Sequence, residues 1–181
     1  MPNFLKDKHI VLGVTGSVAC YKAVDLASKL TQAGALVDVV MTRGASNFVT
    51  PLIFQSITHR SVSSTVFDVE SEAGINHVNT AEKTDLIVVA PATANTIAKM
   101  AMGLADDSLT TMVLATRAPI IICPAMDGHM YTNIMTQANI ERLVSIGHTI
   151  AGPSSGYLAS GLNGDGRLLE TNEIMNHIFK V

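Results

Sequence analysis

The stretch from Asp85 to Asp107 constrains the fold of this chain more than any other segment does. It opens with the apolar run Leu86–Ala90, which is typical of a strand buried on both faces. The run stops at Pro91, a small polar turn follows, and apolar residues then recur at helical spacing. Such a turn places backbone N–H groups at the carboxyl edge of a sheet, where α/β proteins bind small ligands. A plain helix cap explains a single turn of this kind equally well.

Further strand–turn–helix units precede and follow this stretch. Apolar runs predict strands at His9–Val14, Leu36–Met41, Val62–Val66 at an edge, Pro119–Cys123 and Thr149–Ala151. Helical spacing predicts helices at about 19–33, from near Ala45, at Pro51–Ile57, Leu109–Ala115, Thr136–Gly147 and Glu173–Phe179. Alternation of this kind predicts an α/β fold of three layers, a parallel sheet with helices on both faces. The glycine-rich segment 154–167 predicts an irregular flap.

The composition is unusually apolar, with 48% hydrophobic and only 15% charged residues, where about 25% charged is usual. We expect one domain, residues 1–181, whose apolar surplus is hidden in large subunit interfaces. A net charge of -3 without a basic cluster argues against nucleic acid as a partner. The sequence offers neither a membrane span nor a signal peptide, and its two cysteines match no zinc site or disulfide framework. We therefore expect a cytoplasmic protein.

The first predicted strand ends in a turn that suits a phosphate group. Gly16 permits close approach of the backbone to a ligand, and Ser17 places a hydroxyl at the start of the next helix. The turn does not spell the GxGxxG fingerprint, and Thr42 stands where NAD-binding proteins carry an acidic residue. These features weaken NAD and favour a phosphate or an alcohol chain, although a helix cap explains Thr42 equally well. A lone histidine such as His77 is more often an ordinary residue than a catalytic one.

Several ordered motifs resemble one known family, the homo-oligomeric flavin-containing cysteine decarboxylases. They are the N-terminal loop Thr15–Lys22, the histidine His77, the PASANT-like turn Pro91–Thr96, the PXMNXXMW-like segment Pro124–Tyr131 and the flap segment Ala159–Arg167. The match runs in order through essentially the whole chain. It is most similar to the phosphopantothenoylcysteine decarboxylase domain of coenzyme A biosynthesis.

The resemblance implies a flavodoxin-like or Rossmann-like flavoprotein with FMN as cofactor. It implies a homotrimer, or a dodecamer built from trimers, with the flavin near the subunit interface. The FMN contacts that it implies are Gly16, Ser17, Thr42, Thr93, Asn95 and Thr96. The substrate side that it implies comprises His77, Asp127, Met130, Ala159 and Ser160, with catalytic roles for His77, Asp127 and Ser160.

The implied reaction is the decarboxylation of 4'-phosphopantothenoylcysteine to 4'-phosphopantetheine. In this family the flavin oxidises the thiol-bearing carbon, the resulting thioaldehyde loses carbon dioxide, and the reduced flavin returns the electrons. His77 would then be a base or an orienting group near the thiol. Many bacterial members are fused to phosphopantothenoylcysteine synthetase, which the resemblance implies as a partner.

Two residues depart from the family pattern. Asp127 replaces an asparagine that donates to the substrate carboxylate, and an ionised carboxylate there would cost about 4 kcal/mol at contact distance and an effective dielectric of about 20. We expect either that Asp127 is neutral in the complex, its pKa raised by burial and by the neighbouring anion, or that it takes a different role. Ser160 replaces a flap cysteine that helps to reduce the enethiol, and a hydroxyl is a far weaker acid than a thiol.

These departures leave alternatives to the full reaction. One is oxidative decarboxylation of a peptide C-terminal cysteine, which stops at the enethiol. Another is an FMN-binding flavoprotein or reductase without decarboxylase activity.

Overall fold

The computed structural model describes residues 4–63 and 81–181, and a parallel sheet forms its centre. Its strands are β1 (His9–Val14), β2 (Leu36–Met41), β3 (Val62–Ser63), β4 (Leu86–Ala92), β5 (Ile120–Pro124) and β6 (Thr149–Ile150). Every neighbouring pair is parallel, in the order β3-β2-β1-β4-β5-β6. This is the strand order of doubly wound α/β folds, and the order reverses between β1 and β4. The predicted α/β fold is confirmed.

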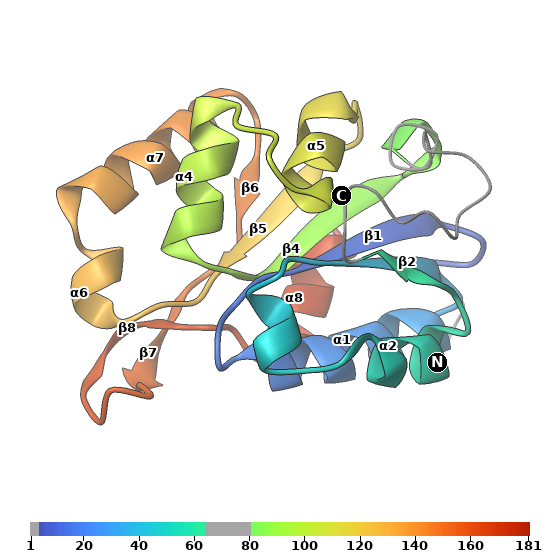
Figure 1. Ribbon diagram of the computed structural model, residues 1–181, viewed down its shortest axis with the longest axis horizontal. Helices are drawn as coiled ribbons and strands as arrows, with labels where there is room; N and C mark the ends of the chain where they lie inside the picture. The colour runs from blue at the N-terminus through green and yellow to red at the C-terminus, as the bar shows by residue number, and fades with distance from the viewer. Residues whose placement is uncertain (1–3, 64–80) are drawn as a thin grey trace.

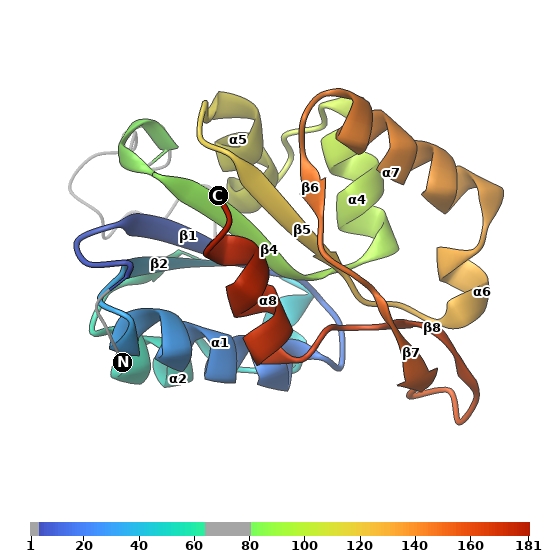
Figure 2. The ribbon, with the colours of Figure 1, turned by 180° about the vertical axis from the view of Figure 1, so that it is seen from behind.

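Helices cover both faces of the sheet, as Figures 1 and 2 show. One layer consists of α1 (Cys20–Gln32), α2 (Pro51–Thr58) and α8 (Thr171–Ile178). The other consists of α4 (Ala94–Met102), α5 (Ser108–Ala115) and α7 (Ile134–Ser145). Two short helical segments, the 3-10 helix η1 (Ala45–Asn47) and α6 (Gly128–Tyr131), lie in the connections that follow β2 and β5.

The strands bury side chains on both faces because successive residues of a strand point to opposite sides. In β4, Val88 packs in the core beneath α1 and α8, whereas Ile87 and Val89 pack in the core beneath α4, α5 and α7. Gly13 in β1 allows α5 to pack closely on the sheet, because a Cβ at this position would lie 2.5 Å from Leu109 Cδ1 of α5. These two cores fix the sheet edge that carries the site.

The strand β4 is longer than the sequence predicted. It continues through Pro91 to Ala92, with a register shift against β5 between Val89 and Ala92. A proline can occupy a strand at such an irregularity because no ladder hydrogen bond is required of its nitrogen. The prediction that the run stops at Pro91 was therefore wrong. The helix that follows, α4, ends at Met102, and Leu104 lies beyond its end and is exposed.

The segment 154–167 is regular, contrary to the prediction. It forms an antiparallel hairpin of β7 (Ser154–Tyr157) and β8 (Asn163–Arg167), which Figure 2 shows beside α6. Positive φ angles at Gly156, Gly161 and Gly166 supply the bends that other residues resist. The glycines therefore shape a hairpin instead of preventing regular structure. Among the helices of the described ranges, none has the length and apolarity to cross a bilayer.

Candidate active site

The ends of β1 and β4 are joined by the side chain of Thr15. This fully buried hydroxyl donates a hydrogen bond of 2.7 Å to the carbonyl oxygen of Pro91. The hydroxyl oxygen of Thr15 in turn accepts a hydrogen bond of 3.0 Å from the backbone N–H of Thr93. Because β1 and β4 flank the point where the strand order reverses, Thr15 fixes the turns that border the ligand crevice of this fold.

Two backbone turns approach each other closely at the same sheet edge. They follow β1 and β2, and a Cβ on Gly16 would lie 2.9 Å from the carbonyl carbon of Gly44. Thr42 is half-buried at the end of β2, and its hydroxyl accepts a weak hydrogen bond of 3.4 Å from the N–H of Ala45. Ser17 is also half-buried, and its hydroxyl accepts from the N–H of Ala19 at 3.3 Å.

The turn before α4 is a true helix cap. Thr93 is the N-cap residue, and its side-chain oxygen accepts from the N–H of Thr96 at 3.3 Å. The two hydroxyls are 3.1 Å apart and hydrogen-bonded, and Thr96 is buried. Asn95 is exposed at this edge. The cap interpretation of Thr93 is confirmed, and a ligand contact by any of these three side chains stays a prediction.

A cavity of about 400 Å³ lies between the start of α1 and the hairpin. Its walls come from three places: residues 17–22, residues 125–127 and the hairpin with the residue that follows it. The cavity thus brings together three parts of the sequence that lie far apart: Ser17, Asp127, and the adjacent pair Ala159 and Ser160. Ser17 belongs to the predicted cofactor set, whereas Asp127, Ala159 and Ser160 belong to the predicted substrate set.

The hairpin packs directly on the loop that carries Asp127. The N–H of Met126 donates a hydrogen bond of 2.9 Å to the carbonyl oxygen of Gly166 in β8. A Cβ on Gly166 would lie 2.3 Å from the oxygen of Met126, and a Cβ on Gly128 would lie 3.1 Å from the oxygen of Asp165. Glycine at positions 128 and 166 therefore permits this close contact.

Asp127 has a lower pKa than an ordinary aspartate. The main cause is a hydrogen bond that the Ser160 hydroxyl donates to the carboxylate. The N–H of His129 adds a second hydrogen bond of 2.9 Å, which makes Asp127 the N-cap residue of α6. Both donors favour the charged form. Burial acts in the opposite direction but is the smaller influence in the protein without substrate. That Asp127 is neutral in the substrate complex stays a prediction.

Two cations also line this cavity, and the sequence reasoning missed them. Lys22 is buried, and its ammonium donates to the carbonyl oxygen of Leu168 at 3.0 Å and to Glu170 Oε1 at 2.9 Å. Arg167 Nη2 donates to the same Glu170 oxygen at 2.6 Å. The available signal was the position of Lys22 beside Ala23 and Leu26 on the inward face of α1, which is unusual for a lysine.

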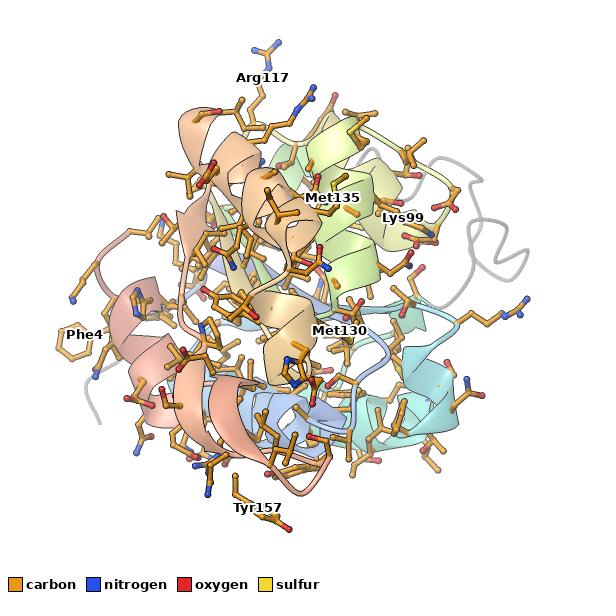
Figure 3. The ribbon with its side chains drawn as sticks, turned by 90° about the vertical axis from the view of Figure 1, so that its left-hand side faces the viewer. Phe4, Lys99, Arg117, Met130, Met135 and Tyr157 are labelled. Carbon is orange, nitrogen blue, oxygen red and sulfur yellow. The ribbon has the colours of Figure 1, made fainter. Side chains whose placement is uncertain are left out.

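The remaining predicted residues lie apart from this group. His77 lies outside the described residues, so its role stays a prediction. Met130 is half exposed on α6, and in Figure 3 it lies between Met135 of α7 and Tyr157 of the hairpin. Thr42, Thr93 and Asn95 border the sheet edge but do not line the cavity.

A sequence model of the Flavoprotein family matches residues 2–181. The chain belongs to the Flavoprotein family. The coenzyme A biosynthesis bifunctional protein CoaBC of Vibrio cholerae is 45% identical over 173 residues, which is 96% of this chain and 43% of that protein. CoaBC of Bacillus subtilis is 47% identical over 171 residues, 94% of this chain and 42% of that protein. The chain therefore spans less than half the length of these curated relatives.

Solved structures agree with this assignment. A cysteine-to-serine mutant of PPC decarboxylase, complexed with pantothenoylaminoethenethiol, matches with a TM-score of 0.85 and 30% identity over 96% of this chain and 97% of that one. The FMN-dependent cysteine decarboxylase SpaF matches with a TM-score of 0.80 and 26% identity over 98% and 99% of the two chains. The predicted family is confirmed, and so is the predicted cofactor, a flavin and in this family FMN.

The residues at the sheet edge fit a flavin phosphate and its alcohol chain. The predicted contacts Gly16, Ser17, Thr42, Thr93, Asn95 and Thr96 contain no carboxylate to repel a phosphate. The turns after β1 and β2 approach so closely that a Cβ on Gly16 would lie 2.9 Å from the carbonyl carbon of Gly44, so this part of the edge depends on glycine, as a close-fitting backbone cradle does.

Proposed function

We propose that this chain is an FMN-dependent decarboxylase of 4'-phosphopantothenoylcysteine in coenzyme A biosynthesis. The observation that carries the proposal is the cavity that joins Ser17 of the predicted cofactor turn to Asp127 and Ser160. Support also comes from the CoaBC relatives and from the likeness to PPC decarboxylase over nearly all of both chains.

The protein's part in this reaction is to hold and orient two ligands. Gly16, Ser17 and Thr42 would hold the FMN phosphate and ribityl chain, while Thr93, Asn95 and Thr96 would border the isoalloxazine ring. When bound, the flavin supplies the two-electron redox chemistry that makes loss of carbon dioxide feasible. His77 would orient or deprotonate the thiol of the substrate.

Two cations of the cavity would bind an anionic substrate. Lys22 and Arg167 are the cations among the described residues that line it, and Asp127 is the carboxylate. Both cations donate to Glu170, which does not line the cavity, so a substrate carboxylate would share or replace these hydrogen bonds. Met130 and Ala159 are exposed beside Asp127 and Ser160 and would contact the body of the substrate.

Mass spectrometry of phosphopantothenoylcysteine after incubation with the FMN-loaded protein tests this function. We expect a product lighter by carbon dioxide alone. Lys22→Met should reduce the rate, whereas Lys29→Met, on the same helix but away from the cavity, should not. An unchanged substrate with fully loaded, folded protein contradicts the proposal.

A second candidate function is oxidative decarboxylation of a peptide C-terminal cysteine. It is favoured by Ser160 at the flap position and by the two cysteines, Cys20 and Cys123, which are buried elsewhere. The same experiment distinguishes it, because its product lacks two further hydrogens. A flavoprotein without decarboxylase activity would bind FMN and leave both substrates unchanged.

We also propose a homo-oligomer, a trimer or a dodecamer of trimers, that works in the cytoplasm beside phosphopantothenoylcysteine synthetase. Exposed apolar side chains support the oligomer. Those on or next to α6, α7 and α4 are Met130, Ile134, Met135, Val144, Ile146, Met102 and Leu104. Two unpaired cysteines support a reducing compartment. Light scattering coupled to size exclusion measures the assembly, and a monomer at micromolar concentration contradicts it.

A further inference from the structure

Glu170 lies at the point where the β7–β8 hairpin, α8 and α1 meet. It comes shortly after β8 and is the N-cap residue of α8, which packs beside α1 in Figure 2. Its Oε1 accepts a hydrogen bond of 2.9 Å from Lys22 Nζ of α1 and one of 2.6 Å from Arg167 Nη2 at the end of β8. One carboxylate oxygen therefore joins the helix and the hairpin that line the cavity.

Lys22 is a buried cation whose hydrogen bonds leave one donor for a ligand. Its side chain is only 8% exposed, and the burial of a charge is costly unless the charge is paired. Glu170 supplies the pairing charge, and the carbonyl oxygen of Leu168 accepts a second hydrogen bond of 3.0 Å. An ammonium group has three N–H donors, and the third has no partner among the described residues. Since Lys22 lines the cavity, this donor is available to an anion bound there.

Arg167 offers further donors from the hairpin. Its guanidinium lies against β7, because a Cβ on Gly156 would lie 3.3 Å from Arg167 Nη1. The bond to Glu170 uses one of its five N–H donors, and the others have no hydrogen-bond partner within residues 4–63 and 81–181. Lys22 and Arg167 both line the cavity, whereas Glu170 does not. The carboxylate thus holds the two cations from outside the cavity and leaves their other donors to a ligand.

We propose that Glu170 is a positioning residue that holds Lys22 and Arg167 together for the substrate carboxylate. Both cations are long side chains with many rotamers, and ordering them before the ligand arrives reduces the entropy that binding costs. Glu170 also supplies the charge that makes the burial of Lys22 tolerable. The inference rests on the proposed function for the identity of the anion, but not for the arrangement of the three charged groups.

Glu170→Gln tests this role, because the amide keeps the size of the side chain and an acceptor oxygen but removes the charge. The matched control is Asp25→Asn. The side chain of Asp25 is 52% exposed, against 55% for Glu170, and it also joins α1 to α8 by accepting from Lys29 and Thr171. Neither Asp25 nor Lys29 lines the cavity. The two variants therefore weaken similar bridges between the same two helices, but only Glu170→Gln affects the cations of the cavity.

Calorimetry with two unreactive ligands measures the effect on the FMN-loaded protein. The first ligand, 4'-phosphopantothenoylserine, has a hydroxyl in place of the thiol, and the second, 4'-phosphopantothenoylethanolamine, also lacks the carboxylate. The ratio of the two dissociation constants therefore reports the contribution of the carboxylate. We expect Glu170→Gln to reduce the preference for the serine ligand about fivefold, the size expected of a charged hydrogen bond, and Asp25→Asn to leave it unchanged. A preference that is unchanged or stronger in Glu170→Gln, or that falls equally in both variants, overturns the proposal.

Labelling of Lys22 with acetic anhydride gives a second readout that needs no substrate. Peptide mass spectrometry should show slow acetylation in the native protein and in Asp25→Asn. In Glu170→Gln the rate should be about threefold higher, because the ammonium is then held by the carbonyl of Leu168 without a charged partner. Equal rates in all three proteins contradict the positioning role. A native protein that binds neither ligand, yet shows the expected labelling, contradicts the proposed function alone.

Discussion

The hydroxyl of Thr15 accepts a hydrogen bond of 3.0 Å from the backbone N–H of Thr93 and donates one of 2.7 Å to the carbonyl oxygen of Pro91. One buried side chain thus satisfies two backbone groups on a neighbouring strand and its turn. A valine of similar shape would leave both groups unpaired, which is more costly than the loss of an ordinary hydrogen bond.

We therefore expect Thr15→Val to lower the free energy of unfolding by about 2 kcal/mol and to weaken FMN binding. Urea denaturation and quenching of FMN fluorescence measure the two effects. Thr31→Val is the control, since the Thr31 hydroxyl donates only to the carbonyl of Ala27 one turn earlier in α1. Equal losses of stability in the two variants would show that Thr15 has no special role.

The two glycines of β8 predict opposite outcomes. A Cβ at Gly166 would lie 2.3 Å from the oxygen of Met126, in a residue whose φ is +135°, whereas a Cβ at Gly164 would meet Leu158 Cδ1 at 3.7 Å. Gly166→Ala should therefore loosen the hairpin by about 2 kcal/mol, and Gly164→Ala should change little.

Hydrogen–deuterium exchange of peptides from 154–167 measures this local effect. Gly166→Ala should increase exchange in the hairpin while strands β1 and β4 stay protected. Slow exchange in both alanine variants would mean that the hairpin does not need its close contact with Met126.

The order of the elements was predictable from the sequence, since buried strands and helical spacing are properties of single segments. The prediction failed where a backbone irregularity or a tertiary contact decided the outcome. Pro91 lies inside β4 because the register against β5 shifts there. In α7, helical spacing groups Ala138 and Val144 with the buried Ile140 and Leu143, yet both are exposed, because only part of that helix packs against α4.

The cofactor edge was predictable because strand ends carry its residues directly. The cavity was not, because it depends on how far the hairpin folds back towards α1. That Asp127, Ser160 and Lys22 line one cavity follows from the way the hairpin folds back. Sequence patterns place such residues in their segments but do not bring the segments together.

Glu170 predicts a pH-dependent contribution to stability. Its pKa is lowered chiefly by the hydrogen bond from Lys22, with Coulombic contributions from Lys22, Arg167 and Lys29. A group whose pKa is lower in the folded state stabilises the fold above its unfolded pKa of about 4.3, and this stabilisation is lost as the pH falls through the folded pKa. Glu170→Gln should therefore be less stable at neutral pH by about 1 kcal/mol, a figure discounted for the exposure of Glu170.

Thermal unfolding at a series of pH values measures this contribution. The difference between the native protein and Glu170→Gln should shrink as the pH is lowered below about 4. Glu141→Gln serves as control, because Glu141 is exposed on α7 and has no ion pair among the described residues. A difference that is constant down to low pH would point to the cap of α8, which Glu170 also provides, rather than to its charge.

The cysteines predict a protein whose thiols do not react while it is folded. Burial raises the pKa of Cys123 to about 12. Cys20 is buried too; its pKa is raised by burial, and its thiol donates to the carbonyl oxygen of Thr15 at 3.1 Å. Since the thiolate is the reactive form, neither residue should react quickly with a thiol reagent at mildly alkaline pH, and both should react in concentrated guanidinium chloride.

Brief iodoacetamide treatment of the folded enzyme should also leave decarboxylation intact, because no thiol lies on the hairpin. Rapid labelling of one thiol with loss of activity would instead show that a cysteine reaches the site.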